Sequence, residues 1–82
     1  MFLPAELRNA NGTTRVHLLN LSTTGALLHG DAPPAPGAVI QLTCAATNWV
    51  ARVVWVQQKR FGVVHIAPFS TRAVATLVSG GS

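Results

Sequence analysis

The chain has 82 residues, a length that fits one domain burying roughly 60 to 65% of its unfolded surface. Six Lys and Arg residues against two acids give a formal net charge of +4, which favours anionic partners, and the single cysteine excludes an internal disulfide and suits a reducing compartment. No run of about 18 apolar residues and no signal peptide is evident, so we expect a cytoplasmic protein without membrane insertion.

Strand-like runs separated by turn residues recur along most of the chain, which is the pattern of a small all-β barrel. Asn11-Gly12 predicts a hairpin turn because glycine accepts positive φ, and three prolines in residues 30–37 predict an exposed loop because proline cannot join a ladder of strand hydrogen bonds. The predicted strands are residues 2–8, 14–21, 26–29, 39–44, 49–57 and 60–67.

The C-terminal residues change pattern after Pro68. Ser70 or Thr71 can cap a short helix. Its apolar residues at helical spacing are Val74, Leu77 and Val78. We therefore predict one all-β domain over residues 1–78, a six-stranded antiparallel barrel with a short C-terminal helix, followed by a flexible tail at residues 79–82.

The apolar content of 49% against 10% charged residues indicates that apolar side chains fill a core and also reach the surface. A surface for a protein partner or for self-association is therefore expected. We interpret Trp49 and Trp55, each in a Val-rich strand, as packing residues rather than base-stacking ones. Gly62 follows Phe61, and we expect it to let a bulky neighbour pass, which is a role in the fold.

No catalytic or metal-binding pattern emerges from the residues. His17, His29 and His65 are far apart in sequence, and no nucleophile elbow or phosphate loop is present. A pair of Cys44 with a histidine is left open by the spacing alone. We predict a protein that is not an enzyme, with no metal and no cofactor.

The segment Asn20-Leu21-Ser22-Thr23-Thr24-Gly25 places short polar side chains at a predicted strand end beside a glycine. An Asn side chain can meet the N–H edge of a purine, a Ser hydroxyl can donate or accept, and glycine allows a flat ring to approach the backbone. These features predict a ligand site at Asn20, Ser22 and Gly25. The alternative is that Asn20 and Ser22 bond to their own turn and Gly25 permits that turn.

The face on which these side chains lie depends on the regularity of the second strand. In a regular strand Val16, Leu18, Asn20 and Ser22 share one face. Both faces of the segment carry apolar residues, so alternation alone does not say which face is inside. A bulge near Asn20 would change the assignment.

The spacing of this segment resembles the D/N-x-S-x-x-G motif of PilZ domains, the bacterial receptors for cyclic di-GMP. Residues 52–56 (Arg-Val-Val-Trp-Val) and 60–63 (Arg-Phe-Gly-Val) are similar to the closing hairpin of that family. The resemblance implies a regulatory binding module of cyclic di-GMP signalling, with Asn20, Ser22 and Gly25 contacting the dinucleotide. In the family an R-x-x-x-R stretch ahead of the first strand supplies further contacts to the ligand.

These 82 residues contain no R-x-x-x-R stretch, and Arg8 and Arg15 do not match it. The stretch would precede Met1, so the native start lies upstream, the chain was trimmed, or the arginines were lost. Losing two arginines costs roughly 3 to 6 kcal/mol of binding free energy, so we expect cyclic di-GMP to bind weakly or not at all. The alternatives are a ligand-independent adaptor for an unknown protein partner, and a basic barrel for single-stranded nucleic acid, which the scattered cations do not favour.

Overall fold

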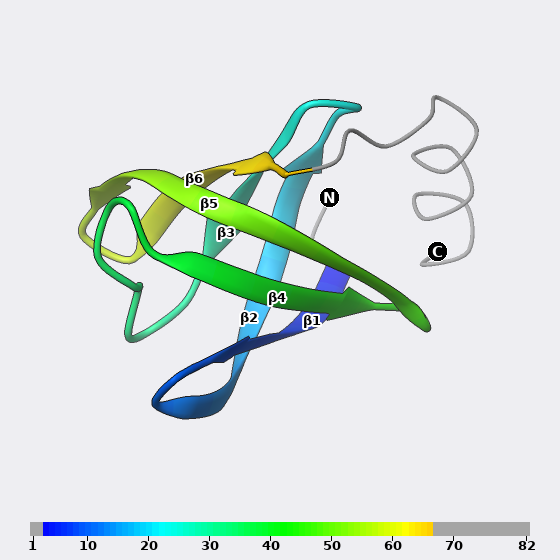
Figure 1. Ribbon diagram of the computed structural model, residues 1–82, viewed down its shortest axis with the longest axis horizontal. Coiled ribbons are helices and arrows are strands. Elements are labelled where there is room, and N and C mark those ends of the chain that lie inside the picture. The colour runs from blue at the N-terminus through cyan, green and yellow to red at the C-terminus, as the bar shows by residue number, and fades with distance from the viewer. Residues whose placement is uncertain (1–2, 67–82) are drawn as a thin grey trace.

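The computed structural model describes residues 3–66, which form six strands joined in a closed barrel (Figure 1). The strands are β1 (Leu3–Asn9), β2 (Gly12–Leu21), β3 (Gly25–His29), β4 (Val39–Cys44), β5 (Thr47–Gln57) and β6 (Arg60–His65). Their order around the barrel is β1-β2-β3-β6-β5-β4, every neighbouring pair is antiparallel, and β4 pairs with β1 to close the ring. The predicted all-β, six-stranded antiparallel barrel is confirmed. The predicted C-terminal helix and tail, and the last residue of the predicted sixth strand, lie outside the described residues.

Alternating side chains explain why these segments form strands around one core. In β1 the buried residues Leu3, Ala5 and Leu7 alternate with exposed ones, and β4 alternates in the same way. Side chains of a strand point to opposite faces, so one set lines the barrel interior. The buried apolar residues are Leu3, Ala5, Leu7, Val16, Leu18, Leu21, Leu28, Ile40, Leu42, Cys44, Trp49, Ala51, Val53, Phe61 and Val63.

The turns follow the predicted chemistry. Gly12 adopts a φ of 124°, and the side-chain oxygen of Asn9 accepts a hydrogen bond of 2.9 Å from the backbone N–H of Asn11. The proline-containing loop between β3 and β4 ends at Gly37, whose φ is 92° and whose N–H donates to the carbonyl of Val53 at 2.7 Å. The predicted hairpin and exposed loop are confirmed, and β5 holds the end of the loop against the barrel.

A bulge in β2 moves Asn20 to the outer face. The register between β2 and β3 shifts between Leu18 and Asn20. Leu18 and Leu21 are both buried, three positions apart, whereas Leu19 is half-buried and Asn20 is exposed. The strand is therefore not regular here, and the bulge considered near Asn20 is present: the extra residue reverses the alternation, so Leu18 and Asn20 lie on opposite faces.

The two tryptophans lie on opposite sides of the barrel wall. Trp49 is buried in the core, where its ring meets that of His65 edge-on at a centroid distance of 5.9 Å. Trp55 is 42% exposed on the outer face, and its indole covers Gly62, its partner on β6. Trp49 is confirmed as a packing residue of the core, whereas Trp55 packs on the outer face. Trp55 is also the bulky neighbour that was expected to pass over Gly62.

Candidate functional site

The turn between β2 and β3 is closed by hydrogen bonds from Ser22. The backbone N–H of Ser22 donates to the carbonyl of Gly25 at 2.9 Å. The Ser22 hydroxyl also reaches that carbonyl, at 3.2 Å, and accepts from the backbone N–H of Gly25 at 3.1 Å and that of Thr24 at 3.3 Å. These bonds fix the turn, because the short hydroxyl side chain satisfies backbone groups that the strands leave unpaired.

Asn20 lies on the outer face at the start of this turn. Its side-chain oxygen accepts a hydrogen bond of 2.9 Å from the backbone N–H of Leu21. The amide nitrogen of Asn20 makes no hydrogen bond within residues 3–66, and the side chain is exposed. Asn20 and Ser22 therefore form hydrogen bonds within their own turn, as the alternative to a ligand site predicts. The amide N–H group of Asn20 still faces solvent. That Asn20 and Ser22 contact a ligand stays a prediction.

Gly25 permits a close approach between two backbones. A Cβ atom at this position would lie 2.5 Å from the carbonyl oxygen of Val63 on β6, a distance that real Cβ atoms do not adopt. Its φ is not in the left-handed region, where Gly12 and Gly37 lie. The absence of a side chain at Gly25 therefore allows β3 to pair closely with β6.

His65 supports the turn from inside the barrel. Its backbone N–H donates to the carbonyl of Thr24 at 2.8 Å, and its ring Nε2 donates to the carbonyl of Ser22 at 3.1 Å. Burial lowers the pKa of His65, and hydrogen bonds at the backbone of Ser22 and Gly25 oppose that shift by raising it. The sequence pattern suggested two roles to weigh for His65, a metal ligand or a partner of Cys44, and neither is this support of the turn. Its position two and four residues after the buried Val63 and Phe61 is the signal that it points inward.

The three predicted site residues line one hollow. Its lining is Asn20, Leu21, Ser22, Gly25, Ala26 and Leu27, and its volume is about 210 Å³. Small-molecule pockets usually measure about 300 to 1,000 Å³. The hollow can therefore contact one edge of a purine ring, and it does not enclose a whole dinucleotide.

The remaining histidine and cysteine side chains of the described residues can be compared with metal and nucleophile sites. Within residues 3–66 no three His, Cys, Asp or Glu side chains gather where they could hold a metal ion. The thiol of Cys44 is buried and donates to the carbonyl of Pro4 at 3.6 Å, and burial raises the pKa of this thiol, which disfavours the nucleophilic thiolate. The described part of the chain contains no helix that is long and apolar enough to span a bilayer.

The comparison with known families agrees with this architecture. The PilZ domain family matches residues 1–79, and no curated protein matches the chain. Residues 52–56 and 60–63, which resemble the closing hairpin of that family, lie on the antiparallel strands β5 and β6. The D/N-x-S-x-x-G spacing at residues 20–25 lies at the turn between β2 and β3. The chain belongs to the PilZ domain family.

Proposed function

We propose that this chain is a non-catalytic PilZ-type module of bacterial cyclic di-GMP signalling, acting in the cytoplasm, whose affinity for the dinucleotide is weak or lost. The family match makes it a member of a group of cyclic di-GMP-binding modules. The observation that carries the proposal is the convergence of Asn20, Ser22 and Gly25 on one hollow at the junction of β2 and β3.

The geometry of the hollow supports weak binding. The Ser22 hydroxyl already holds its own turn, which leaves the amide nitrogen of Asn20 as the donor facing outward. Neither Arg8 nor Arg15 stands in an R-x-x-x-R stretch. Each charged hydrogen bond to guanine or phosphate contributes about 1.5 to 3 kcal/mol, so a site without two of them falls from micromolar towards millimolar affinity.

Isothermal titration calorimetry with cyclic di-GMP tests this proposal. The 82-residue chain should bind with a millimolar dissociation constant or give no heat. A second protein, in which an R-x-x-x-R segment precedes Phe2, should bind tighter by orders of magnitude, because the added guanidinium groups contact guanine and phosphate. If the extended protein still does not bind the dinucleotide, the hollow at Asn20, Ser22 and Gly25 is not the binding site.

A matched pair of variants in the extended protein locates the site. Asn20→Ala should weaken binding by about tenfold, which corresponds to the loss of one hydrogen bond of about 1.4 kcal/mol. Asn48→Ala removes the same side chain from an exposed position on β5, away from the hollow, and should change affinity by less than about twofold.

A specific surface feature favours a second candidate, a ligand-independent adaptor. The exposed large apolar side chains of the described residues lie on or next to β4, β5 and β6. They are Val39, Val50, Val54, Trp55, Val64 and Ile66. An apolar surface of this kind on a small domain is typical of protein contact sites. Calorimetry separates the two candidates, because an adaptor would show no dinucleotide binding even after the arginine segment is added.

A further inference from the structure

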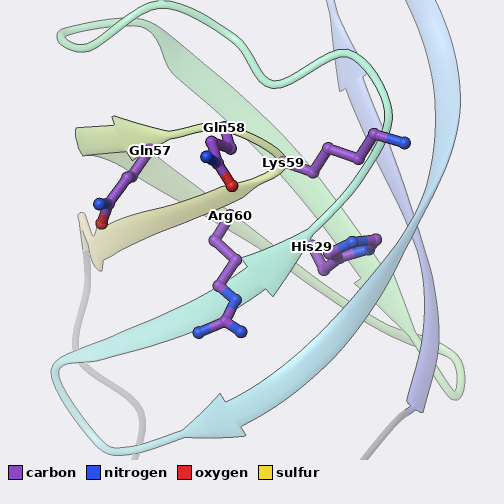
Figure 2. A pocket seen from close by; sticks show the side chains of 5 residues that line it. All are labelled: His29, Gln57, Gln58, Lys59 and Arg60. Carbon is purple, nitrogen blue, oxygen red and sulfur yellow. The ribbon is translucent and has the colours of Figure 1, made fainter.

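A row of side chains that carry N–H groups crosses the outer face of four strands. Gln57, Arg60, His29 and His17 are successive cross-strand partners on β5, β6, β3 and β2. Their neighbours Leu18, Leu28 and Phe61 are fully buried, so the row itself faces outward. Figure 2 shows Gln57, Arg60 and His29 in succession on neighbouring strands. At about 4.8 Å between strands, the row is about 14 Å long.

Two adjoining hollows lie along this row. One, of about 600 Å³, is lined by His29, Gln57, Gln58, Lys59 and Arg60 (Figure 2). The other, of about 500 Å³, is lined by His17, Leu19, His29 and Arg60. They share His29 and Arg60, so these two residues lie where the two hollows adjoin, and together the hollows are called the depression centred on His29 and Arg60. Neither hollow shares a residue with the one at the turn between β2 and β3.

The charges around the row favour an anion. The chain has only two acidic residues, Glu6 and Asp31. Glu6 lies opposite Arg15 in the pairing of β1 with β2, and Asp31 forms an ion pair of 3.3 Å with Lys59. Neither carboxylate belongs to the row, so the guanidinium of Arg60 is flanked by N–H donors on both sides, with no negative partner among the described residues.

The donor set suits a phosphate better than a metal cation. Arg60 can direct two N–H groups at one phosphate, and the imidazole of His29 and the amide of Gln57 carry further N–H groups on the neighbouring strands. Two opposed imidazoles could also hold a cation, but no third ligand joins His17 and His29 among residues 3–66, and the positive charge of Arg60 repels a metal ion.

We propose that the depression centred on His29 and Arg60 is a binding site for the phosphate group of a small nucleotide, separate from the hollow at Asn20. Arg60 and His29 bind the phosphate, while Leu19 and the ring of His17 offer an apolar wall to the base. Lys59 can add a second charge, since its ion pair with Asp31 is exposed and therefore weak. This proposal does not rest on cyclic di-GMP binding, because a chain that does not bind that dinucleotide can still bind a nucleotide in this depression.

The test is a titration of the 82-residue chain, followed by amide chemical shifts, with three probes: GMP, inorganic phosphate and guanosine. GMP should shift the resonances of His29, Gln57 and Arg60 saturably, and inorganic phosphate should shift the same resonances with weaker affinity. Guanosine should shift them little, because it lacks the phosphate. Equal responses to guanosine and GMP, or no response to phosphate, would overturn the proposal.

Matched arginine variants separate a built site from general charge attraction. Arg60→Gln should weaken GMP binding by about tenfold or more, and His29→Gln by about threefold. Arg52→Gln removes the same charge from an exposed position on β5, where Val39 and Val64 are its cross-strand partners, and should weaken binding by less than about twofold. All three positions are on the outer face, and circular dichroism checks that each variant keeps the fold. Equal losses from Arg60→Gln and Arg52→Gln would mean that GMP responds only to net charge, which would overturn the proposal.

Discussion

Single residues at the barrel wall have roles that depend on what lies across the sheet from them. Gly62 is the clearest example, because its cross-strand partner is Trp55 and a Cβ atom at Gly62 would collide with the indole. The bulge between Val53 and Trp55 turns both Val54 and Trp55 outward, and Trp55 then lies over the glycine. A glycine weakens an ordinary strand, but here it lets a large aromatic side chain cover the backbone.

We expect Gly62→Ala to destabilise the barrel by about 1 to 2 kcal/mol, because the indole of Trp55 must move away. In a Trp55→Ala background the same change should be neutral or stabilising, since alanine costs less conformational entropy than glycine. Urea denaturation of the four proteins, followed by far-UV circular dichroism, gives the coupling free energy of the pair, expected to be about 1 kcal/mol or more. Equal costs in both backgrounds would mean that the indole does not cover Gly62.

At the scale of elements, the end of β6 and the turn between β2 and β3 act as one unit. His65 bonds to the carbonyls of Ser22 and Thr24, and Val63 occupies the space beside Gly25. The turn that carries the candidate site is therefore held by a residue distant in the sequence, as His65 and Ser22 are separated by 43 positions. The strength of this junction should depend on the protonation of one buried imidazole.

Burial holds the pKa of His65 below its ordinary value of 6.5, so the neutral ring is favoured in the folded protein. As pH falls through about 6.5, the unfolded chain takes up this proton before the folded one does, and the free energy of unfolding decreases until the folded form is also protonated. Thermal unfolding between pH 8 and pH 5 should show this loss. In the His65→Gln variant, whose amide can still donate to Ser22, the melting temperature should depend less on pH over this range.

The control for this pH profile is His17→Gln, which removes an exposed imidazole from β2. This variant should keep the decrease in melting temperature between pH 8 and pH 5. An unchanged slope in His65→Gln would mean that the acid sensitivity arises elsewhere.

At the scale of the whole molecule, closure of the barrel decides stability. β1 joins β4 through three paired positions, and Leu7 lies in the middle of them, 2% exposed and opposite Leu42. A chain of 82 residues is expected to have an unfolding free energy of about 4 to 12 kcal/mol. One large cavity at the closing seam can remove a substantial part of it.

Leu7→Ala should reduce the unfolding free energy by about 2 to 5 kcal/mol, because it leaves a cavity between β1, β2 and β4. Val39→Ala, at a position that is 51% exposed, should change it by less than about 0.5 kcal/mol. Urea titration at 25 °C compares the two variants with the natural sequence. A loss for Leu7→Ala no larger than that for Val39→Ala would contradict the closed core.

Much of the fold followed from the sequence, because its determinants are local. Alternation in β1 and β4, the turn glycine Gly12 and the proline loop each act within a few residues, so strand positions and turns could be predicted. The three motif residues also stay together, since they belong to one turn.

Contacts between distant strands were decided only by the tertiary structure. The bulge that turns Asn20 outward depends on the register of β2 against β3, and the inward role of His65 depends on the position of Ser22 across the barrel. The opposition of His29 to both His17 and Arg60 likewise exists only when β2, β3 and β6 pair. The sequence determined by itself which segments become strands and turns, because these preferences are short-range; which side chains meet across the sheet was set by strand register, a property of the closed barrel as a whole.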